Sequence, residues 1–322
     1  MNDIQNDIHK KIALLKKELS NAVIGQEDMI DSLLIGLLCD GHILVEGVPG
    51  LAKTTTINAL SRAINLDAKR IQFTPDLLPS DIIGAQVYNP KDHSFSIKKG
   101  PIFTHLLLAD EINRAPAKVQ SALLEVMQER QVTIGDETFK IAAPFLVMAT
   151  QNPIEQEGVY RLPEAQLDRF MMKIIVKHNT EDEELDIMRK AAKKSFTEVK
   201  AVLSLDNLQG LQKALENVHI DEEIERYMVQ LISATREPHR FGLENLTDII
   251  RFGASPRASI DLYKASRAQA YLKGKDFVSP SDISVVIHSV LRHRIVLSYE
   301  ARAKNLTSDE IISQIVETLP IP

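Results

Sequence analysis

A lysine and a threonine stand directly after a glycine-containing turn near the start of the chain. In residues 43–60, ILVEGVPGLAKTTTINAL, an apolar run leads into a loop that begins at Gly47, and a helical pattern follows Lys53 and Thr54. A loop between a strand and a helix directs backbone N–H groups and the positive end of the helix dipole toward a phosphate. The spacing resembles G-x-x-x-x-G-K-[ST], in which the lysine contacts the β- and γ-phosphates of a nucleotide and the hydroxyl contacts Mg²⁺.

One position of this loop departs from the pattern, because Ala52 stands where a second glycine is usual. Alanine is the next smallest residue, and we expect the position to be close to helical, so that alanine is tolerated there. The alternative is an ordinary Gly/Pro turn before a helix. If the pattern holds, the nucleotide is bound by the loop and the first helical residues, namely Gly47, Val48, Pro49, Gly50, Leu51, Ala52, Lys53, Thr54 and Thr55.

Polar side chains also follow two later strand-like runs. Asp110 and Glu111 come after the apolar residues 106–109, and Asn152 follows residues 145–150. Continuous apolarity predicts strands that are covered on both faces, as in a parallel sheet. Because ligands of such sheets bind beyond the carboxyl ends of the strands, we expect these side chains to face the phosphate loop. Asp110 then helps to hold Mg²⁺, and Glu111 polarises the water that attacks the γ-phosphate. The alternative for two carboxylates after a strand is an exposed loop.

The elements that must position these residues change in character along the chain. Strand-like runs alternate with helical patterns in the first half, which predicts an α/β fold with a parallel sheet and right-handed connections. From Thr180 onward the patterns are helical, with capping-box spacing at Thr180, Ser279 and Thr307. We therefore expect an α/β nucleotide-binding domain over residues 1–178 and a helical domain over residues 179–322.

Two segments of the first half are predicted to be β-hairpins. Alternating arms at residues 86–88 and 94–97 flank the turn-rich stretch 89–93. A second pair of arms lies within residues 131–141, around Gly135 and Asp136. The first hairpin carries Val87, Tyr88 and Phe95, so we expect apolar side chains on a protruding segment.

The composition indicates a cytoplasmic globular protein. The chain has 322 residues, a formal net charge of −6 and one cysteine, so a disulfide framework within the chain is excluded. Cys39 lies in an apolar run and is expected to be buried. We find no apolar signal core at the N-terminus and no run long enough to span a membrane. Net acidity argues against a dedicated nucleic-acid binder. The histidines are scattered and offer no metal site, so the predicted site for Mg²⁺ with ATP is the one metal site we expect.

Several motifs together resemble a known family. GVPGLAKT, LLLADEINRA, ATQNP, LPEAQLDRF and GASPRA, in this order, are similar to the AAA+ ATPases, and more narrowly to the MoxR group and its relatives, the magnesium-chelatase motor subunits. The resemblance extends from Val23 to the end of the helical half. It implies an AAA+ P-loop core with a parallel five-stranded sheet in the order 5-1-4-3-2 and a C-terminal all-α lid domain. The hairpins would be the helix-2 insert and the pre-sensor hairpin of this clade.

The resemblance also implies a role for each motif. Lys53 and Thr54 would belong to the Walker A motif, and Asp110 and Glu111 to Walker B. Asn152 would be sensor 1. Val23, Ile24, Gly25 and Gln26 would lie near the adenine. Arg169 would be the arginine finger that acts on a neighbour's nucleotide, and Arg257 would be the sensor 2 residue in the lid. Arg161 and Arg114 would be further interface candidates.

The implied function is that of an ATP-hydrolysing, chaperone-like ATPase that uses Mg²⁺ and works as a ring, expected to be a hexamer. It would remodel or activate partner proteins, or assist metal or cofactor insertion into them, with a von Willebrand factor A domain protein as the expected partner. The alternative is a nucleic-acid-dependent motor of the same clade. A nucleotide switch that does not hydrolyse ATP is a third class, and the presence of Glu111 argues against it.

Overall fold

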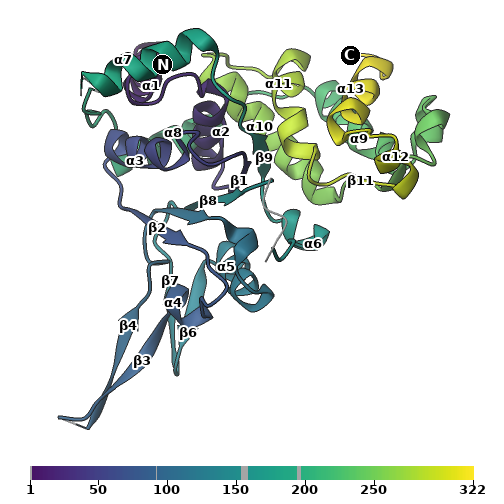
Figure 1. Ribbon diagram of the computed structural model, residues 1–322. Coiled ribbons are helices and arrows are strands. Elements are labelled where there is room, and N and C mark those ends of the chain that lie inside the picture. The colour runs from purple at the N-terminus through teal and green to yellow at the C-terminus, as the bar shows by residue number, and fades with distance from the viewer. Residues whose placement is uncertain (1, 92, 154–158, 194–196) are drawn as a thin grey trace. The chain divides into compact units, whose positions relative to one another are not determined.

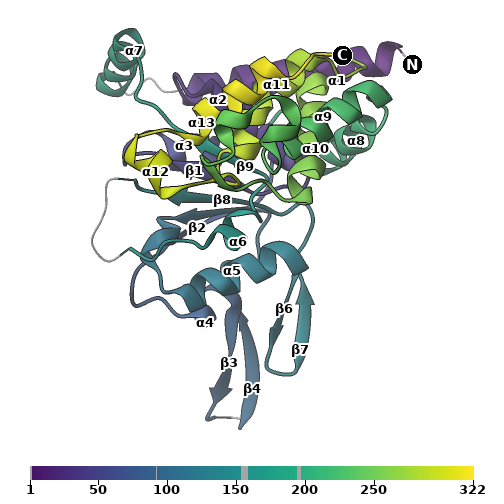
Figure 2. The same cartoon turned by 90° about the vertical axis from the view of Figure 1, so that its right-hand side faces the viewer.

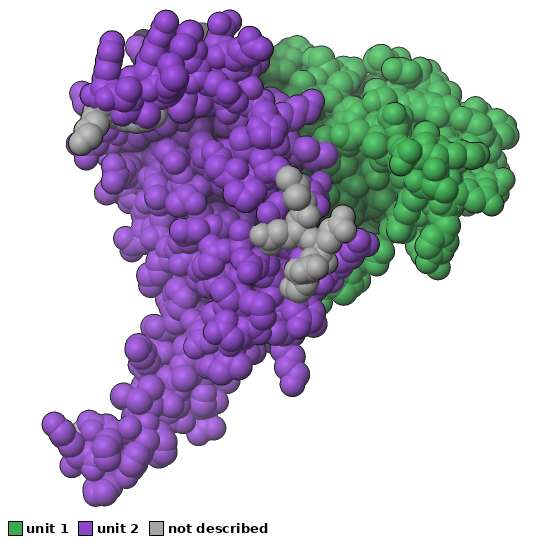
Figure 3. Space-filling model, viewed as in Figure 1, with its two compact units in different colours: residues 1–9, 163–173, 209–322 green, residues 10–162, 174–208 purple. Residues whose placement is uncertain are grey.

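The computed structural model describes residues 2–91, 93–153, 159–193 and 197–322, which form two compact units. The sheet unit comprises residues 10–162 and 174–208, and the helical unit comprises residues 1–9, 163–173 and 209–322 (Figure 3). The chain therefore crosses between the units more than once. The single domain boundary expected at residue 178 stays a prediction.

A five-stranded parallel sheet organises the sheet unit (Figure 1). Its strands lie side by side in the order β2-β5-β8-β1-β9, which is the predicted order 5-1-4-3-2 when they are numbered along the chain. β1 pairs in parallel with β8, β8 with β5, and β5 with β2. The strand bounds are β1 (Ile43–Glu46), β2 (Ala68–Gln72), β5 (Leu106–Asp110), β8 (Leu146–Gln151) and β9 (Met172–Ile175).

Helices cover both faces of this sheet, which explains why its central strands are apolar throughout. α2 and α3 lie on one face and α5 on the other, as Figures 1 and 2 both show. The side chains of β5 from Leu106 to Ala109 are fully buried, as continuous apolarity predicts. Cys39 is buried at the end of α2, also as expected. The helices of this part of the chain are α1 (Asn2–Ala22), α2 (Glu27–Leu38), α3 (Lys53–Ile64), α4 (Pro79–Ile83), α5 (Ala117–Glu129) and α7 (Glu181–Ala192).

Both predicted hairpins are present. β3 (Gly84–Asn89) pairs with β4 (Ser94–Lys99), and β6 (Gln131–Ile134) pairs with β7 (Glu137–Lys140). The first hairpin projects away from the sheet (Figure 2). In its turn, Asp92 lies outside the described residues. The base of this hairpin requires glycine, because a Cβ on Gly100 would lie 2.1 Å from the Ile82 carbonyl oxygen.

The C-terminal part of the chain is helical, as predicted, with one small addition. β10 (Ile250–Phe252) pairs antiparallel with β11 (Val296–Leu297). The capping boxes at Thr180, Ser279 and Thr307 are all formed. The other elements are α6 (Glu164–Leu167), α8 (Leu205–Leu215), α9 (Glu222–Ala234), α10 (Pro256–Leu272), α11 (Pro280–Leu291), α12 (Tyr299–Ala303), α13 (Ser308–Thr318) and the 3₁₀ turns η1 (Ile112–Arg114), η2 (Pro238–Phe241) and η3 (Glu244–Leu246).

The described part of the chain has neither a membrane-spanning helix nor a cluster of metal ligands. No helix there combines the length and the apolar character that crossing a bilayer requires. In the same residues, no group of three or more histidine, cysteine, aspartate or glutamate side chains is arranged to hold a metal ion.

Candidate nucleotide site

The predicted phosphate-binding elements meet at a pocket of about 330 Å³ in the sheet unit. The loop leaves β1 at Gly47, whose N–H donates to the Gln151 carbonyl of the neighbouring strand at 3.2 Å, and α3 begins at Lys53. The loop, the ends of β2 and β5, and Asn152 after β8 therefore line one cavity. Its lining residues are Pro49, Gly50, Ala52, Lys53, Thr54, Thr55, Arg70, Gln72, Asp110, Glu111 and Asn152.

The expectation that Ala52 is close to helical is wrong. Its φ of 54° and ψ of 13° lie in the left-handed region, where a Cβ costs roughly 1–2 kcal/mol. The Ala52 carbonyl is nevertheless the first acceptor of α3, because Thr56 donates to it through its N–H at 2.8 Å and its hydroxyl at 2.9 Å. The sharp turn is thus kept with alanine in place of glycine.

Lys53 reaches across the loop rather than into solvent. Its Nζ donates to the Gly47 carbonyl oxygen at 2.7 Å. Burial lowers the pKa of Lys53, while the nearby Asp110 and Glu111 carboxylates oppose this change. A phosphate oxygen is a stronger acceptor than a carbonyl because it carries charge, so a bound nucleotide can replace the Gly47 oxygen as the partner of this ammonium.

The hydroxyl of Thr150 holds both carboxylate residues in place. It donates to Asp110 Oδ1 at 2.6 Å and accepts from the Glu111 N–H at 2.8 Å, and the residue is fully buried. Glu111 itself has a φ of 55°, in the left-handed region. Gln120, also fully buried, supports the following turn because its Nε2 donates to the carbonyls of Ile112 and Ala115. Sequence reasoning missed this function of Thr150, although the ATQNP motif contains it.

Three side chains that sequence reasoning did not connect with the carboxylates bind them directly. Arg70 donates to Asp110 Oδ2 through Nη2 at 2.6 Å and Nε at 3.2 Å. Gln72 Nε2 donates to Glu111 Oε2 at 2.7 Å, and Arg114 Nη1 donates to the same oxygen at 3.0 Å. The resemblance implies only an interface role for Arg114, whereas in the structure it binds Glu111 of its own chain. The implied sheet order places β2 beside β5, but only the structure gives the register in which Gln72 lies opposite Asp110.

The predicted adenine-contacting segment is fixed within the sheet unit. Gln26 Nε2 lies 3.3 Å from the Lys177 carbonyl and from Asn179 Oδ1, and Asn179 Nδ2 donates to the Ile24 carbonyl at 2.9 Å. Gly25 has a φ of +71°, so the turn favours glycine. Contact of residues 23–26 with a base remains a prediction.

Two predicted arginines belong to the helical unit rather than to the sheet unit. Arg169 follows α6, and Arg257 lies in the first turn of α10. Arg257 Nη1 lies 3.7 Å from Asp168 Oδ2 and 3.4 Å from the Asp168 carbonyl oxygen. Arg161 is exposed and belongs to the sheet unit. The functions of these three arginines remain predictions.

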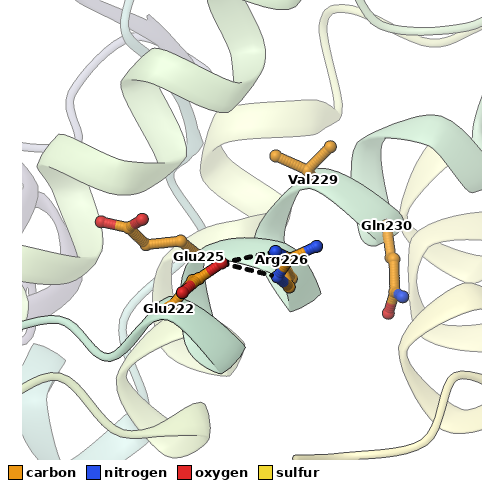
Figure 4. A pocket seen from close by; sticks show the side chains of 5 residues that line it. All are labelled: Glu222, Glu225, Arg226, Val229 and Gln230. Atoms are coloured by element: carbon orange, nitrogen blue, oxygen red, sulfur yellow. Dashed lines mark hydrogen bonds and ion pairs between the residues drawn. The ribbon is translucent and has the colours of Figure 1, made fainter.

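A second hollow, of about 410 Å³, lies along α9 in the helical unit. Figure 4 shows that its side chains come from one helix and that Glu222 is paired with Arg226. No predicted nucleotide-site residue lines it. The pocket at the phosphate loop, which the predicted residues do line, is therefore the candidate nucleotide site.

Comparison with known proteins identifies the family. Residues 42–172 match the model of the ATPase family associated with various cellular activities (AAA), and residues 245–315 match the AAA lid domain. Chaperone MoxR1 from Mycobacterium tuberculosis is 46% identical over 305 residues, which cover 95% of this chain and 81% of the relative. The chain belongs to the MoxR family of AAA+ ATPases.

Other relatives match over nearly their full length. Protein MoxR from Paracoccus denitrificans is 33% identical over 98% of both chains, and YeaC from Bacillus subtilis is 40% identical over 99% of this chain and 97% of its own. A crystal structure of a protein from Cytophaga hutchinsonii, provisionally assigned as an ATPase, has a TM-score of 0.94 at 47% identity. That alignment covers 100% of this chain and 98% of the other. The similarity therefore includes both the sheet unit and the helical unit.

The donor groups of this MoxR-family pocket suit a nucleotide with Mg²⁺. Lys53 supplies a compact positive charge for phosphate oxygens. Thr54 and Asp110 line the same pocket and offer a hydroxyl and a carboxylate, which are the hard oxygen ligands that Mg²⁺ prefers. The residues present therefore fit the group that the family implies.

Proposed function

We propose that this chain binds Mg·ATP at the phosphate-loop pocket and hydrolyses it to ADP and phosphate, in the cytoplasm. The observation that supports the proposal is that Lys53, Asp110, Glu111 and Asn152 line one pocket although three different strands position them. Such a set can bind phosphates, hold a divalent cation and orient water. Phosphoryl transfer requires chiefly positioning and neutralisation of charge.

Each residue then has a defined task. Lys53 exchanges its Gly47 carbonyl partner for the β- and γ-phosphates. Thr54 and Asp110 hold Mg²⁺, which when bound adds positive charge beside the phosphate oxygens. Glu111 leaves Gln72 and Arg114 to accept a hydrogen bond from the attacking water, and Asn152 helps to place that water.

Two substitutions test this proposal. Lys53→Ala should weaken nucleotide binding by about tenfold or more, because a charge-assisted interaction in a half-buried site is lost. Glu111→Gln should retain nucleotide affinity but lower kcat by about 10²–10⁴-fold, the usual contribution of a general base. Lys69→Ala and Glu125→Gln are matched controls, because both residues are exposed and neither lines the pocket. Unchanged affinity in Lys53→Ala by calorimetry would contradict the assignment of the loop.

We further propose that the active form is a homo-oligomeric ring, a hexamer, in which Arg169 completes the neighbour's site and Arg257 serves the site of its own chain. A head-to-tail interface that repeats by rotation closes into a ring. An arginine supplied by another subunit can raise turnover about 10³-fold or more. Mixing Arg169→Ala subunits, which have an intact site, with Glu111→Gln subunits, which still offer Arg169, should give more activity than either alone. If labelled subunits exchange and the mixture stays inactive, Arg169 does not act on its neighbour.

The cellular task we propose is that of a chaperone-like ATPase that remodels or activates a partner, or assists metal or cofactor insertion into it. A relative of high identity is named a chaperone. The family resemblance favours a partner with a von Willebrand factor A domain. Glu111→Gln protein should hold ATP, so with ATP it should retain such a partner on an affinity column, whereas Lys53→Ala protein should not. Equal retention by both variants would contradict a nucleotide-dependent interaction.

A further inference from the structure

One buried arginine binds the backbone on both sides of Arg169. The Arg294 side chain is 1% exposed, and its Nε donates to Asp168 Oδ1 at 2.9 Å. Its Nη2 donates to the carbonyl oxygens of Asp168 at 3.3 Å and Phe170 at 2.9 Å. Its Nη1 lies 3.4 Å from the carbonyl oxygen of Met171. Asp261 supplies a second carboxylate to the same guanidinium. The conformation of the chain at Arg169 is therefore fixed by one group inside the helical unit.

The Asp168 carboxylate also binds the start of α10, which carries Arg257. Ser255 Oγ donates to this carboxylate, with distances of 2.9 Å to Oδ2 and 3.1 Å to Oδ1. The same hydroxyl accepts from the Arg257 N–H at 3.2 Å, because Ser255 is the N-cap of α10. Arg257 Nη1 also contacts the Asp168 carbonyl at 3.4 Å. A chain of hydrogen bonds thus joins the segment of Arg169 to that of Arg257.

These bonds resist separation of the two segments. Hydrogen bonds to a charged group are stronger than neutral ones. Removing Asp168 from its place would also leave the buried Arg294 guanidinium with Asp261 as its one carboxylate partner among the described residues. A buried charge that loses a partner is strongly unfavourable. The segment around Arg169 and the first turn of α10 therefore behave as one body within the helical unit.

We propose that Asp168 and Ser255 are positioning residues that couple Arg257 to Arg169. This inference rests on the proposed function, in which Arg257 contacts the nucleotide of its own chain and Arg169 that of the neighbour. When Arg257 changes position with its own nucleotide, Arg169 moves with it. The nucleotide state of one subunit thereby controls the arginine that it presents to the next subunit. Neither Asp168 nor Ser255 needs to touch a nucleotide.

The test measures how well a subunit presents Arg169 while its own site is unable to hydrolyse ATP. Arg169→Ala subunits are mixed with donor subunits that carry Glu111→Gln, and the ATPase activity of the mixture is recorded. In the donor, Ser255→Ala removes the bond between α10 and Asp168 but leaves Arg169 and Arg294 unchanged. We expect the restored activity to fall about tenfold, as for loss of one hydrogen bond to a charged group.

Two further donors separate coupling from stability. Ser298→Ala removes another serine N-cap of the helical unit, whose Oγ accepts from the Ala301 N–H at 3.3 Å and is not bonded to Asp168. It should lower the melting temperature through the loss of a helix cap, which Ser255→Ala also loses, but leave the restored activity unchanged. Ser255→Thr retains a hydroxyl and should restore the activity lost in Ser255→Ala.

The outcomes distinguish the coupling of Arg257 to Arg169 from the proposed function on which it rests. If the Ser255→Ala donor restores as much activity as the parent donor, or if Ser298→Ala lowers the activity equally, the coupling is wrong while the action of Arg169 on its neighbour stands. If the parent Glu111→Gln donor restores nothing although labelled subunits exchange, the proposed role of Arg169 fails, and this inference fails with it.

Discussion

Arg70 forms an ion pair with Asp110 inside the nucleotide pocket, with 2.6 Å between Nη2 and Oδ2. The arginine side chain is 51% exposed and that of Asp110 is 14% exposed. The same Nη2 donates to Gln72 Oε1 at 2.8 Å, and Gln72 in turn binds Glu111. Side chains of β2 therefore donate hydrogen bonds to both carboxylates. A cation that binds Asp110 must compete with the Arg70 guanidinium.

Replacing Arg70 by glutamine should change the Mg²⁺ requirement of nucleotide binding. We expect Arg70→Gln to lower the Mg²⁺ concentration at half-maximal binding about two- to fivefold, the range of a partly exposed ion pair. Titration of a fluorescent ADP analogue with Mg²⁺ measures this concentration without hydrolysis. Lys69→Gln is the control, because Lys69 is exposed and donates to the Phe103 carbonyl away from the pocket. Weaker binding at saturating Mg²⁺ would instead show that Arg70 contacts the phosphates.

Removing the Thr150 hydroxyl should slow turnover more than it weakens nucleotide binding. Thr150→Val keeps the shape but leaves the Glu111 N–H without its acceptor and Asp110 Oδ1 without its donor, at a cost of about 1–3 kcal/mol for a buried unpaired group. We expect kcat to fall about tenfold or more with a small change in nucleotide affinity. Thr150→Ser should retain most of the activity. Equal turnover in Thr150→Val and the parent would mean that this hydroxyl does not position Glu111.

The tip of the first hairpin should act on partners rather than on stability. Tyr88 and Phe95 pair across the strands with ring centroids 5.1 Å apart, and they are 46% and 64% exposed. Because these rings contact each other instead of the core, replacing both with serine should leave the melting temperature and basal ATPase activity unchanged but impair partner activation. Tyr299→Ser, which removes another exposed ring, is the control. A clear drop in melting temperature would indicate a structural function for the pair.

Acid should destabilise the fold through His42. This buried ring accepts from the Val147 N–H at Nδ1 and lies 3.1 Å from the Met127 carbonyl at Nε2, so its neutral form fits. Burial, with Arg130 nearby, lowers its pKa from 6.5 to about 3. Because the unfolded chain binds the proton more tightly, the stability that His42 contributes above pH 6.5 is lost as pH falls toward 3, at about 1.4 kcal/mol per pH unit.

His42→Gln keeps one donor and one acceptor but does not titrate. Urea denaturation at pH 7, 6 and 5 should show a smaller loss of unfolding free energy with acid in this variant than in the parent. His219→Gln, at an exposed histidine, is the control for the replacement of an imidazole by an amide. The same slope in His42→Gln and the parent would show that His42 does not determine the acid sensitivity.

The sequence by itself determined the features that depend on local pattern. The run from Ile43 to Leu60 predicted strand, loop and helix, since each is encoded by neighbouring residues. Apolar runs ending in Asp110 and Asn152 predicted buried parallel strands, and the ordered motifs predicted the sheet order. The hairpins and the capping boxes followed from turn residues and fixed short spacings. In these cases the interacting groups lie close together in the chain or repeat a known arrangement.

The tertiary structure alone decided which side chains meet across elements. Arg70 reaches Asp110 because β2 lies beside β5, and Thr150 reaches both carboxylates because β8 lies on the other side of β5. Arg294 became a buried partner of Asp168 through packing within the helical unit. Such contacts depend on strand order, register and burial, which join residues far apart in the chain, and a charged residue has no local pattern that reveals its partner. The backbone of Ala52 differs from the predicted helical conformation for a related reason. Its left-handed conformation follows from how the loop closes between β1 and α3.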